Sequence, residues 1–187
     1  ARRDELTRRI DGVEPQPAPA NTPAAAVPGT VEEAVAAQLG ATLAQIRKLP
    51  KGSWTNELVT DGYDTPVKLV ATVTIGDDEV QVDFTGSDPV SRWGINVPQI
   101  YSKAYASYAL KCAFAGDIPN NAASLSLFSV TSPPNILNAA RPAPVSLRHV
   151  IGHLVPDLVL GALAKALPGQ VLAEGARELV LVGQDTA

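Results

Sequence analysis

The segment VDFTGSDPVSRWGINVPQIYSKAYASYALKCAFAGDIPNN, residues 82–121, connects the two kinds of structure that the sequence predicts. It leaves a strand at the turn-forming run 85–89, passes a second Gly/Pro/Asn-rich break at 94–98 and enters a helix near Gln99. Gly116 ends this helix, and a polar turn follows at 117–121. A strand and a long helix joined in this way indicate a mixed α and β domain.

Three strands are predicted before this segment ends, because the apolar residues alternate with polar ones. They cover residues 54–60, 67–75 and 79–85, and Gly76-Asp77-Asp78 joins the last two in a tight hairpin. Within residues 67–75 every second side chain is apolar, which is typical of a strand with one covered face. The pattern therefore predicts an antiparallel sheet.

Helices are predicted on both sides of the sheet in the sequence. A charged helix at 1–10 and a Pro/Ala-rich linker at 14–29 precede a capping box of Thr30 and Glu33, which starts a helix that ends at Lys48. After the polar turn come a short strand at 125–130 and a helix at 147–167, which Pro156 should bend or break in two. A last short strand is predicted at 178–183.

The fold class that follows is α+β, with an antiparallel sheet packed against several helices. Residues 1–29 are expected to form the charged helix and linker, and residues 30–187 a single domain. The chain has 187 residues, which is long enough for one domain with a proper core.

The composition excludes several classes of function. The formal net charge of −4 provides no basic surface for nucleic acid, so none is expected as a partner. No apolar run approaches the length of a membrane span, and the N-terminus lacks the apolar core of a signal peptide, so we expect a cytoplasmic protein without membrane contact. Cys112 is the single cysteine, which excludes an internal disulfide and a cysteine-based zinc site. Its position within the helix predicts a small buried core residue.

Five residues are candidates for binding a substrate. The side-chain amides of Asn96, Asn120 and Asn121 lie in the two polar turns, where they could hold a carbonyl or a carboxylate group. Asparagine is also common in turns because it tolerates left-handed backbone, so a structural role stays open. Arg148 and His149 begin the last long helix, where a cation opposes the helix dipole and suggests an anionic partner or substrate.

The remaining polar residues favour structural roles. His149, His153 and Asp157 follow at i, i+4 and i+8, but the third is too far along a helix to share one ion with the first, so no metal site is predicted. Asp88 and Asp117 are expected to form Asx-type turns. The three tyrosines 101, 105 and 108 are expected to be core residues. Phosphate-binding glycine loops and a G-x-S-x-G motif are absent, so catalytic residues stay unassigned.

Four motifs occur in an order that resembles the hydantoinase B/oxoprolinase family. They are VDFTGSDP, YALKC, DIPNN and R-x4-H-x3-D-x4-A-L, the last formed by Arg148, His153, Asp157, Ala162 and Leu163, and the similarity covers residues 49–175. The resemblance implies a subunit of an ATP-dependent amidohydrolase complex that opens a hydantoin- or lactam-like ring. It implies a hydantoinase A-like, ATP-using subunit and the rest of a B-type subunit as partners. No cofactor is expected in this chain, whereas ATP and a divalent metal are expected in the complete complex.

The resemblance is partial. The His/Asp-rich region that holds the family's metal and the glycine-rich segment after the last long helix have no counterpart here, and Ala122 follows DIPNN where the family has glycine. We therefore expect a C-terminal-half fragment or a split subunit that is inactive alone and works in a hetero-oligomer. Two alternatives stay open, a subunit of an ATP-dependent carboxylase for acetone or acetophenone, and a noncatalytic scaffold.

Overall fold

The structure, a computed structural model, describes residues 30–169. The helix at 1–10, the linker at 14–29 and the strand at 178–183 lie outside these residues, and their prediction stays a prediction. The chain divides into two compact units, Ala1–Ala34 and Val35–Ala187, so the domain boundary expected after residue 29 also stays a prediction. Among the described residues, the helices are all too short or too polar to cross a bilayer.

The sheet has four strands in the order β1-β2-β3-β4: β1 Gly52–Thr60, β2 Val67–Ile75, β3 Val80–Asp83 and β4 Phe128–Thr131. β1, β2 and β3 pair antiparallel in sequence order, which confirms the predicted sheet. β4 pairs parallel to β3, with Phe128 opposite Val80, and this arrangement was not predicted. Residues between these two strands therefore form a crossover connection rather than a hairpin.

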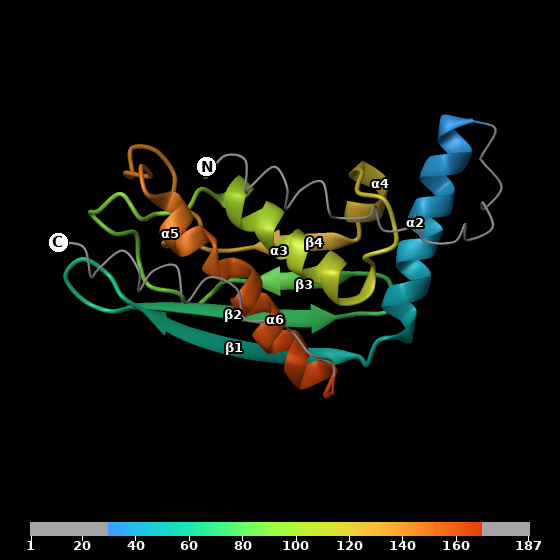
Figure 1. Ribbon diagram of the computed structural model, residues 1–187, viewed down its shortest axis with the longest axis horizontal. Helices are drawn as coiled ribbons and strands as arrows, with labels where there is room; N and C mark the ends of the chain where they lie inside the picture. The colour runs from blue at the N-terminus through green and yellow to red at the C-terminus, as the bar shows by residue number, and fades with distance from the viewer. Residues whose placement is uncertain (1–29, 170–187) are drawn as a thin grey trace, which may run out of the picture. The chain divides into compact units, whose positions relative to one another are not determined.

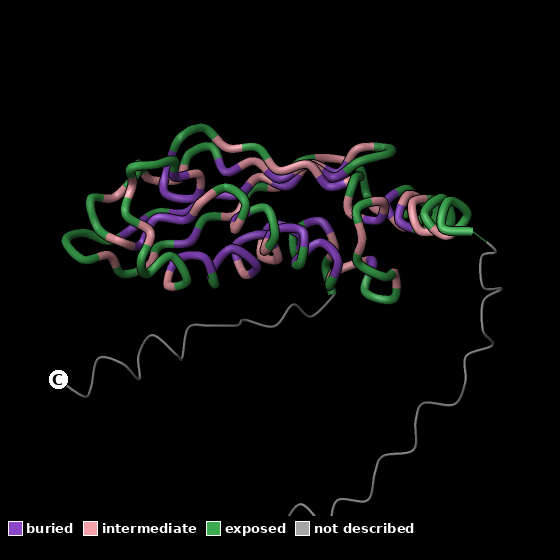
Figure 2. The backbone as a smooth tube through the Cα atoms, turned by 90° about the horizontal axis from the view of Figure 1, so that it is seen from above, coloured by how far each residue is buried: buried purple, intermediate pink, exposed green. Residues whose placement is uncertain are grey.

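Within residues 30–169, five helices accompany the sheet: α2 Val31–Lys48, α3 Gln99–Phe114, α4 Ala122–Leu125, α5 Arg148–Gly152 and α6 Leu154–Ala166. α3, α5 and α6 lie on one face of the sheet (Figure 1), and the buried residues lie between the two layers (Figure 2). Leu69, Val73 and Val82 from the sheet meet Leu158 and Leu163 from α6, all of them fully buried. The predicted α+β class is confirmed.

The opposite face of the sheet is polar where β1 pairs with β2. Hydroxyl pairs join Ser53 to Thr74 at 2.8 Å and Thr55 to Thr72 at 2.9 Å. Asn56, one residue further along β1, points to the helical layer instead, where its Nδ2 donates to the carbonyl of Leu158. This alternation produces the single covered face that the sequence predicts.

The predicted break in the last long helix is confirmed, but it lies before Pro156. α5 ends at Gly152, and α6 begins at Leu154, so Pro156 occupies the first turn of α6. Proline is tolerated in a first turn, where its missing N–H would have no helical partner, but its ring excludes the carbonyl four residues earlier from a regular helix. That carbonyl belongs to Gly152, the last residue of α5.

The TGSDP run continues the sheet beyond β3 by means of side chains. Ser87 Oγ accepts from the amide of Val70 at 2.9 Å and donates to its carbonyl at 3.1 Å, and Asp88 Oδ2 accepts from the amide of Lys68 at 2.8 Å. Gly86 has a φ of 96°, which glycine adopts without strain. An Asx-type turn was expected at Asp88, but this prediction is wrong. The Asx-type contact is formed by Asp83, whose Oδ1 accepts from the amide of Thr85.

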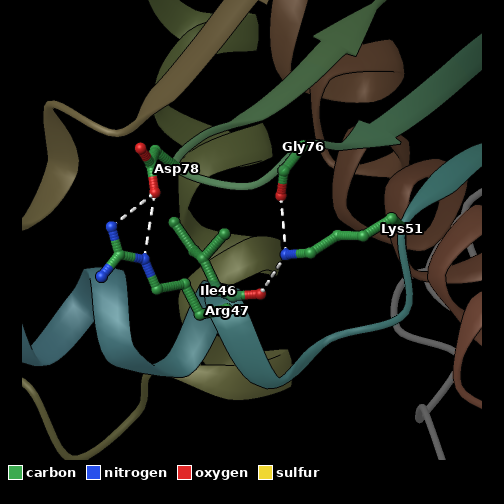
Figure 3. A network of polar contacts seen from close by, with 5 residues as sticks. All are labelled: Ile46, Arg47, Lys51, Gly76 and Asp78. Atoms are coloured by element: carbon green, nitrogen blue, oxygen red, sulfur yellow. Dashed lines mark hydrogen bonds and ion pairs between the residues drawn. The ribbon is translucent and has the colours of Figure 1, made fainter.

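The end of α2 is attached to the β2–β3 hairpin (Figure 3). Arg47 Nη2 lies 2.9 Å from Asp78 Oδ1, and Lys51 Nζ donates to the carbonyls of Ile46 at 3.0 Å and Gly76 at 2.8 Å. Both members of the ion pair are more than half exposed, so the pair contributes at most about 1 kcal/mol. The burial of Ile46 in the core is the stronger link.

Candidate functional site

The structure separates the five predicted ligand-binding residues into two groups at opposite ends of α3. Asn96 precedes α3, and Arg148 and His149 begin α5, which lies beside the first turns of α3 (Figure 1). Asn120 and Asn121 follow its last turn. At about 1.5 Å per residue, the 16 residues of α3 extend over about 24 Å. A single cyclic amide is too small to contact both groups.

Asn96 is completely buried, and its amide holds a loop together. Nδ2 donates to the carbonyls of Ser91, Trp93 and Pro144, each at 2.8 Å, and Oδ1 accepts from the amide of Ser91 at 2.7 Å. Because an amide carries only two donor hydrogens, both are fully used within the chain. The side chain joins the loop after β3 to the segment before α5.

Asn121 also has a structural function, whereas Asn120 faces open space. Asn121 forms a capping box with Ser124 at the start of α4, and its Nδ2 donates to Gln38 Oε1. Asn120 is exposed and lines two adjoining pockets. Of the two predicted residues in this turn, Asn120 is the one available to a ligand.

Tyr101, Tyr105, Arg148, His149 and His153 form what we call the α3–α5 ring cluster. The rings of Tyr101 and Tyr105 stack at 4.6 Å between centroids, Tyr105 lies 5.8 Å from His153, and His153 lies 6.0 Å from His149. Both imidazoles are exposed, and both phenols are half-buried, so water reaches one side of the stack. Phenol and imidazole groups donate and accept hydrogen bonds, and guanidinium pairs with carboxylate, so the cluster is suited to an amide or a carboxylate ligand.

Close packing fixes the cluster. A Cβ atom on Gly152 would collide with Tyr101 Cε1, so α5 approaches α3 this closely only because residue 152 is glycine. Burial, together with the neighbouring Tyr105 hydroxyl, raises the pKa of Tyr101 to about 12, against a smaller opposing effect of Arg148. The Tyr101 phenol therefore stays protonated and can donate a hydrogen bond at neutral pH.

The described residues do not fit the divalent metal that the resemblance implies. Within residues 30–169, no three His, Cys, Asp or Glu side chains converge as metal ligands would. His149 and His153 belong to the ring cluster, and Asp157 lies on α6, beyond the break between the helices.

A groove of about 510 Å³ lies between α3 and α4, and we call it the α3–α4 groove. Its lining comprises Ile100, Lys103, Ala104, Ser107, Tyr108, Lys111, Asn120, Ala122, Leu125 and Ser126. Lys111 is only 5% exposed and its Nζ donates to the carbonyl of Ile118. Burial lowers the pKa of Lys111.

Two residues on the outer side of α3 were expected in the core, and both predictions are wrong. Cys112 is exposed and not buried, and Tyr108 is 60% exposed, whereas Tyr101 and Tyr105 pack against the core as expected. The reason is the rotation of α3 about its axis, which turns Lys111 inward, where the Ile118 carbonyl accepts its ammonium group. The next residue, Cys112, then faces outward.

A second pocket, of about 360 Å³, lies among the loops beyond β1 and β3. Its polar centre is Asp64, whose Oδ2 accepts from Trp93 Nε1 at 2.6 Å and from Arg92 Nε at 3.1 Å. The indole N–H, assisted by Arg92, lowers the pKa of this carboxyl group. These hydrogen bonds connect the loop after β1 to the loop after β3, so the contacts of Asp64 with the described residues are structural.

Comparison with known proteins decides the family. The family described as Hydantoinase B/oxoprolinase matches residues 21–185, which is nearly the whole chain. The chain belongs to this family. The four sequence motifs thus identify the family correctly, and the ring cluster holds two residues of the last motif, Arg148 and His153.

The hydantoinase B relatives are much longer than the matched segment. A protein of Pseudomonas sp. (strain NS671) described as the B subunit of a D-/L-hydantoinase is 33% identical over an alignment of 143 residues, which covers 68% of this chain and 24% of the relative. An uncharacterized protein of Methanocaldococcus jannaschii is 27% identical over 64% of this chain and 22% of its own length. The chain spans about a quarter of the curated relatives that it matches.

A solved structure shares the fold. The crystal structure of the ATP-dependent caprolactamase from Pseudomonas jessenii superposes with a TM-score of 0.65 and 24% identity, over 73% of this chain and 24% of that chain. At this identity the similarity concerns the fold. It shows that the two-layer arrangement of a hydantoinase B-type segment also occurs within a larger polypeptide.

Sequence reasoning named Arg148 and His149 as candidates for ligand binding, but it did not connect them with Tyr101, Tyr105 and His153, which lie in the same cluster. The signal was present, because Tyr101 and Tyr105 are four residues apart, as are His149 and His153, and such pairs share one face of a helix. Which helix faces which cannot be deduced from this spacing. The contact between the two pairs is therefore a finding of the structure.

Proposed function

We propose that this chain forms part of the B-type subunit of an ATP-dependent amidohydrolase complex, which opens a hydantoin- or lactam-like ring. The observation that carries the proposal is the family match over residues 21–185. A relative described as a hydantoinase B-type polypeptide and a fold shared with an ATP-dependent caprolactamase support it. In this proposal a hydantoinase A-like partner uses the ATP, and the divalent metal is held outside residues 30–169.

The α3–α5 ring cluster is the part of this chain best suited to contact the ring substrate. Opening a cyclic amide converts a neutral carbonyl into a carboxylate, and a cleaved nitrogen must gain a proton. Arg148 can pair with the carboxylate, and the exposed imidazoles of His149 and His153 can donate or accept the proton. Tyr101 and Tyr105 provide a flat surface against which a five- or seven-membered ring can pack. Asn120 lies at the far end of α3, so in this proposal it contacts a partner polypeptide and not the ring substrate.

The test is reconstitution of the complex. The chain is purified together with the A-like and remaining B-type polypeptides of its locus, and ADP release is measured with hydantoin, 5-oxoproline or caprolactam. We expect ADP release that depends on a cyclic amide and is matched by formation of the ring-opened product in mass spectrometry. The isolated chain should show no turnover.

Other outcomes would replace the proposal. Incorporation of labelled bicarbonate into acetone or acetophenone, without hydrolysis of any cyclic amide, would indicate the carboxylase alternative. A stable complex without turnover of either substrate class would indicate a scaffold.

A variant of the ring cluster shows whether Arg148 binds the substrate or only stabilises the fold. Arg148→Gln, on an exposed side chain, should raise KM for the cyclic amide at least tenfold, with an unchanged free energy of unfolding. The control Arg141→Gln also removes an exposed arginine, but outside the cluster, and should leave KM unchanged.

A further inference from the structure

The outward face of α3 has the composition of a buried surface. Ile100, Ala104, Tyr108 and Cys112 follow one another at intervals of four residues, share one face of the helix and are all exposed, Ile100 to 76% and Tyr108 to 60%. Three polar residues of the same helix are buried instead, with Ser102 at 0%, Ser107 at 7% and Lys111 at 5% exposure, whereas Gln99 and Lys103 are exposed. A helix that is apolar on its outer face as well as toward its core is normally enclosed on both sides.

Ile100, Ala104 and Tyr108 of this apolar stripe line one wall of the α3–α4 groove, and Cys112 lines the pocket that adjoins it. Ala122 and Leu125 provide apolar surface on the other wall, so the groove can take apolar side chains over about 510 Å³. Large apolar side chains that are exposed beside a groove, with polar residues at its rim, are typical of a protein–protein contact.

The charge of the groove indicates what the partner must carry. Lys111 is occupied by the Ile118 carbonyl. Lys103 lines the groove, is exposed and forms no ion pair with any other residue in the range 30–169. A docked segment would therefore match the groove best with apolar side chains and one carboxylate near Lys103.

The length of the relatives indicates which polypeptide could occupy the groove. The matched segment is 24% of the B-type hydantoinase relative and 24% of the caprolactamase chain, so each of these proteins has about three times as much polypeptide outside the matched segment. We propose that the apolar stripe and the α3–α4 groove are the docking surface for the remaining part of the B-type subunit. The docked segment presents apolar side chains to Ile100 and Tyr108 and a carboxylate to Lys103. This inference rests on the proposed function only in assuming a B-type subunit.

A matched pair of alanine variants tests the surface. Ala104 lies in the groove and Ala164 on α6, and both are exposed helical alanines. The chain is co-expressed with the remaining B-type sequence of its locus, and the affinity of the purified partners is measured. Ala104→Glu should weaken binding at least tenfold, whereas Ala164→Glu should leave it unchanged. Equal affinities for both variants, or no binding by the wild-type chain, would overturn the proposal.

Charge reversal tests the carboxylate. Lys103→Glu should weaken binding and reverse its salt dependence, so that added salt strengthens binding of the variant and weakens that of the wild-type chain. An unchanged salt dependence would remove the carboxylate from the proposal.

Cys112 provides a direct readout, because it is the single cysteine of the chain and is exposed at the end of the stripe. A maleimide should label it readily in the free chain and at least tenfold more slowly in the complex. Equal labelling rates would contradict the proposed surface. Protection that instead rises with the concentration of the chain alone would identify a second copy as the occupant and overturn the assignment to the remaining B-type polypeptide.

Failure of the docking surface can be distinguished from failure of the proposed function. A complex that protects Cys112 but hydrolyses no cyclic amide retains the docking surface and loses the function. A complex that hydrolyses the amide while Cys112 labels freely retains the function and loses the docking surface.

Discussion

Asn96 shows how a polar residue in a Gly/Pro-rich turn can be wholly structural. Its amide bonds four backbone groups at zero exposure, so Asn96→Ala would leave several of them without a partner. We expect the free energy of unfolding to fall by about 2 kcal/mol, measured by urea denaturation. The control Asn120→Ala, on an exposed residue, should change it by less than about 0.5 kcal/mol. Unchanged stability of Asn96→Ala would contradict this interpretation.

Tyr101 should be distinguishable from the other tyrosines by its titration. Burial raises its pKa from 10.0 to about 12, so the folded chain keeps this proton after the unfolded chain has lost it. The unfolded state then binds fewer protons, and the free energy of unfolding falls as the pH rises from 10 to 12. In an absorbance titration at alkaline pH, Tyr101→Phe should remove the phase with the highest midpoint. Loss of a phase near pH 10 instead would show that Tyr101 is not buried in this way.

At the scale of single residues, the sequence predicts local contacts well. The capping box of Thr30 and Glu33 is confirmed by both of its hydrogen bonds, because the two residues lie within one helical turn. The exposure of Cys112 and the burial of Lys111 were not predictable, because both depend on how α3 is rotated against the sheet. For the same reason the amide of Asn96 could not be assigned to the backbone of Pro144, 48 residues away.

The contact of α5 with α3 depends on a glycine. Gly152→Ala would place a Cβ atom against the Tyr101 ring, so the ring must move, and we expect a loss of about 1–3 kcal/mol of stability. The Tyr101 titration should shift from about 12 toward 10.0 as the stack opens. Gly40→Ala is the control, because the space around Gly40 in α2 is open, and it should stabilise the chain by about 0.5–1 kcal/mol. Equal effects of the two variants would rule out close packing at Gly152.

Elements with their own periodic pattern were predicted correctly, and elements that depend on distant partners were not. β1, β2 and α3 have the predicted type and nearly the predicted bounds. The strand expected at 125–130 is correct only from Phe128, because residues 122–125 form the short helix α4, capped by Asn121. The parallel pairing of this strand, β4, with β3 leaves no local signal in the sequence, because two helices, α3 and α4, separate the two strands along the chain.

Across the whole domain, α2 should unfold together with the sheet. Ile46 is fully buried in the same core as Leu69 and Leu163, whereas Val35 is 43% exposed. Ile46→Ala should lower the free energy of unfolding by about 2–4 kcal/mol, and Val35→Ala by less than about 0.5 kcal/mol. Circular dichroism and tryptophan fluorescence should report one coincident transition for both variants. A separate early loss of helical signal in Ile46→Ala would show that α2 unfolds independently.

The parallel pairing of β4 with β3 imposes an order on folding. β1, β2 and β3 pair as neighbours in the chain, so their contacts close short loops and can form early. β4 reaches β3 only after the whole connection that contains α3 and α4 has been closed, which carries a larger loss of chain entropy. The same connection contains the groove wall and two rings of the ring cluster. The surfaces proposed for substrate and partner are therefore completed only after β1, β2 and β3 have paired.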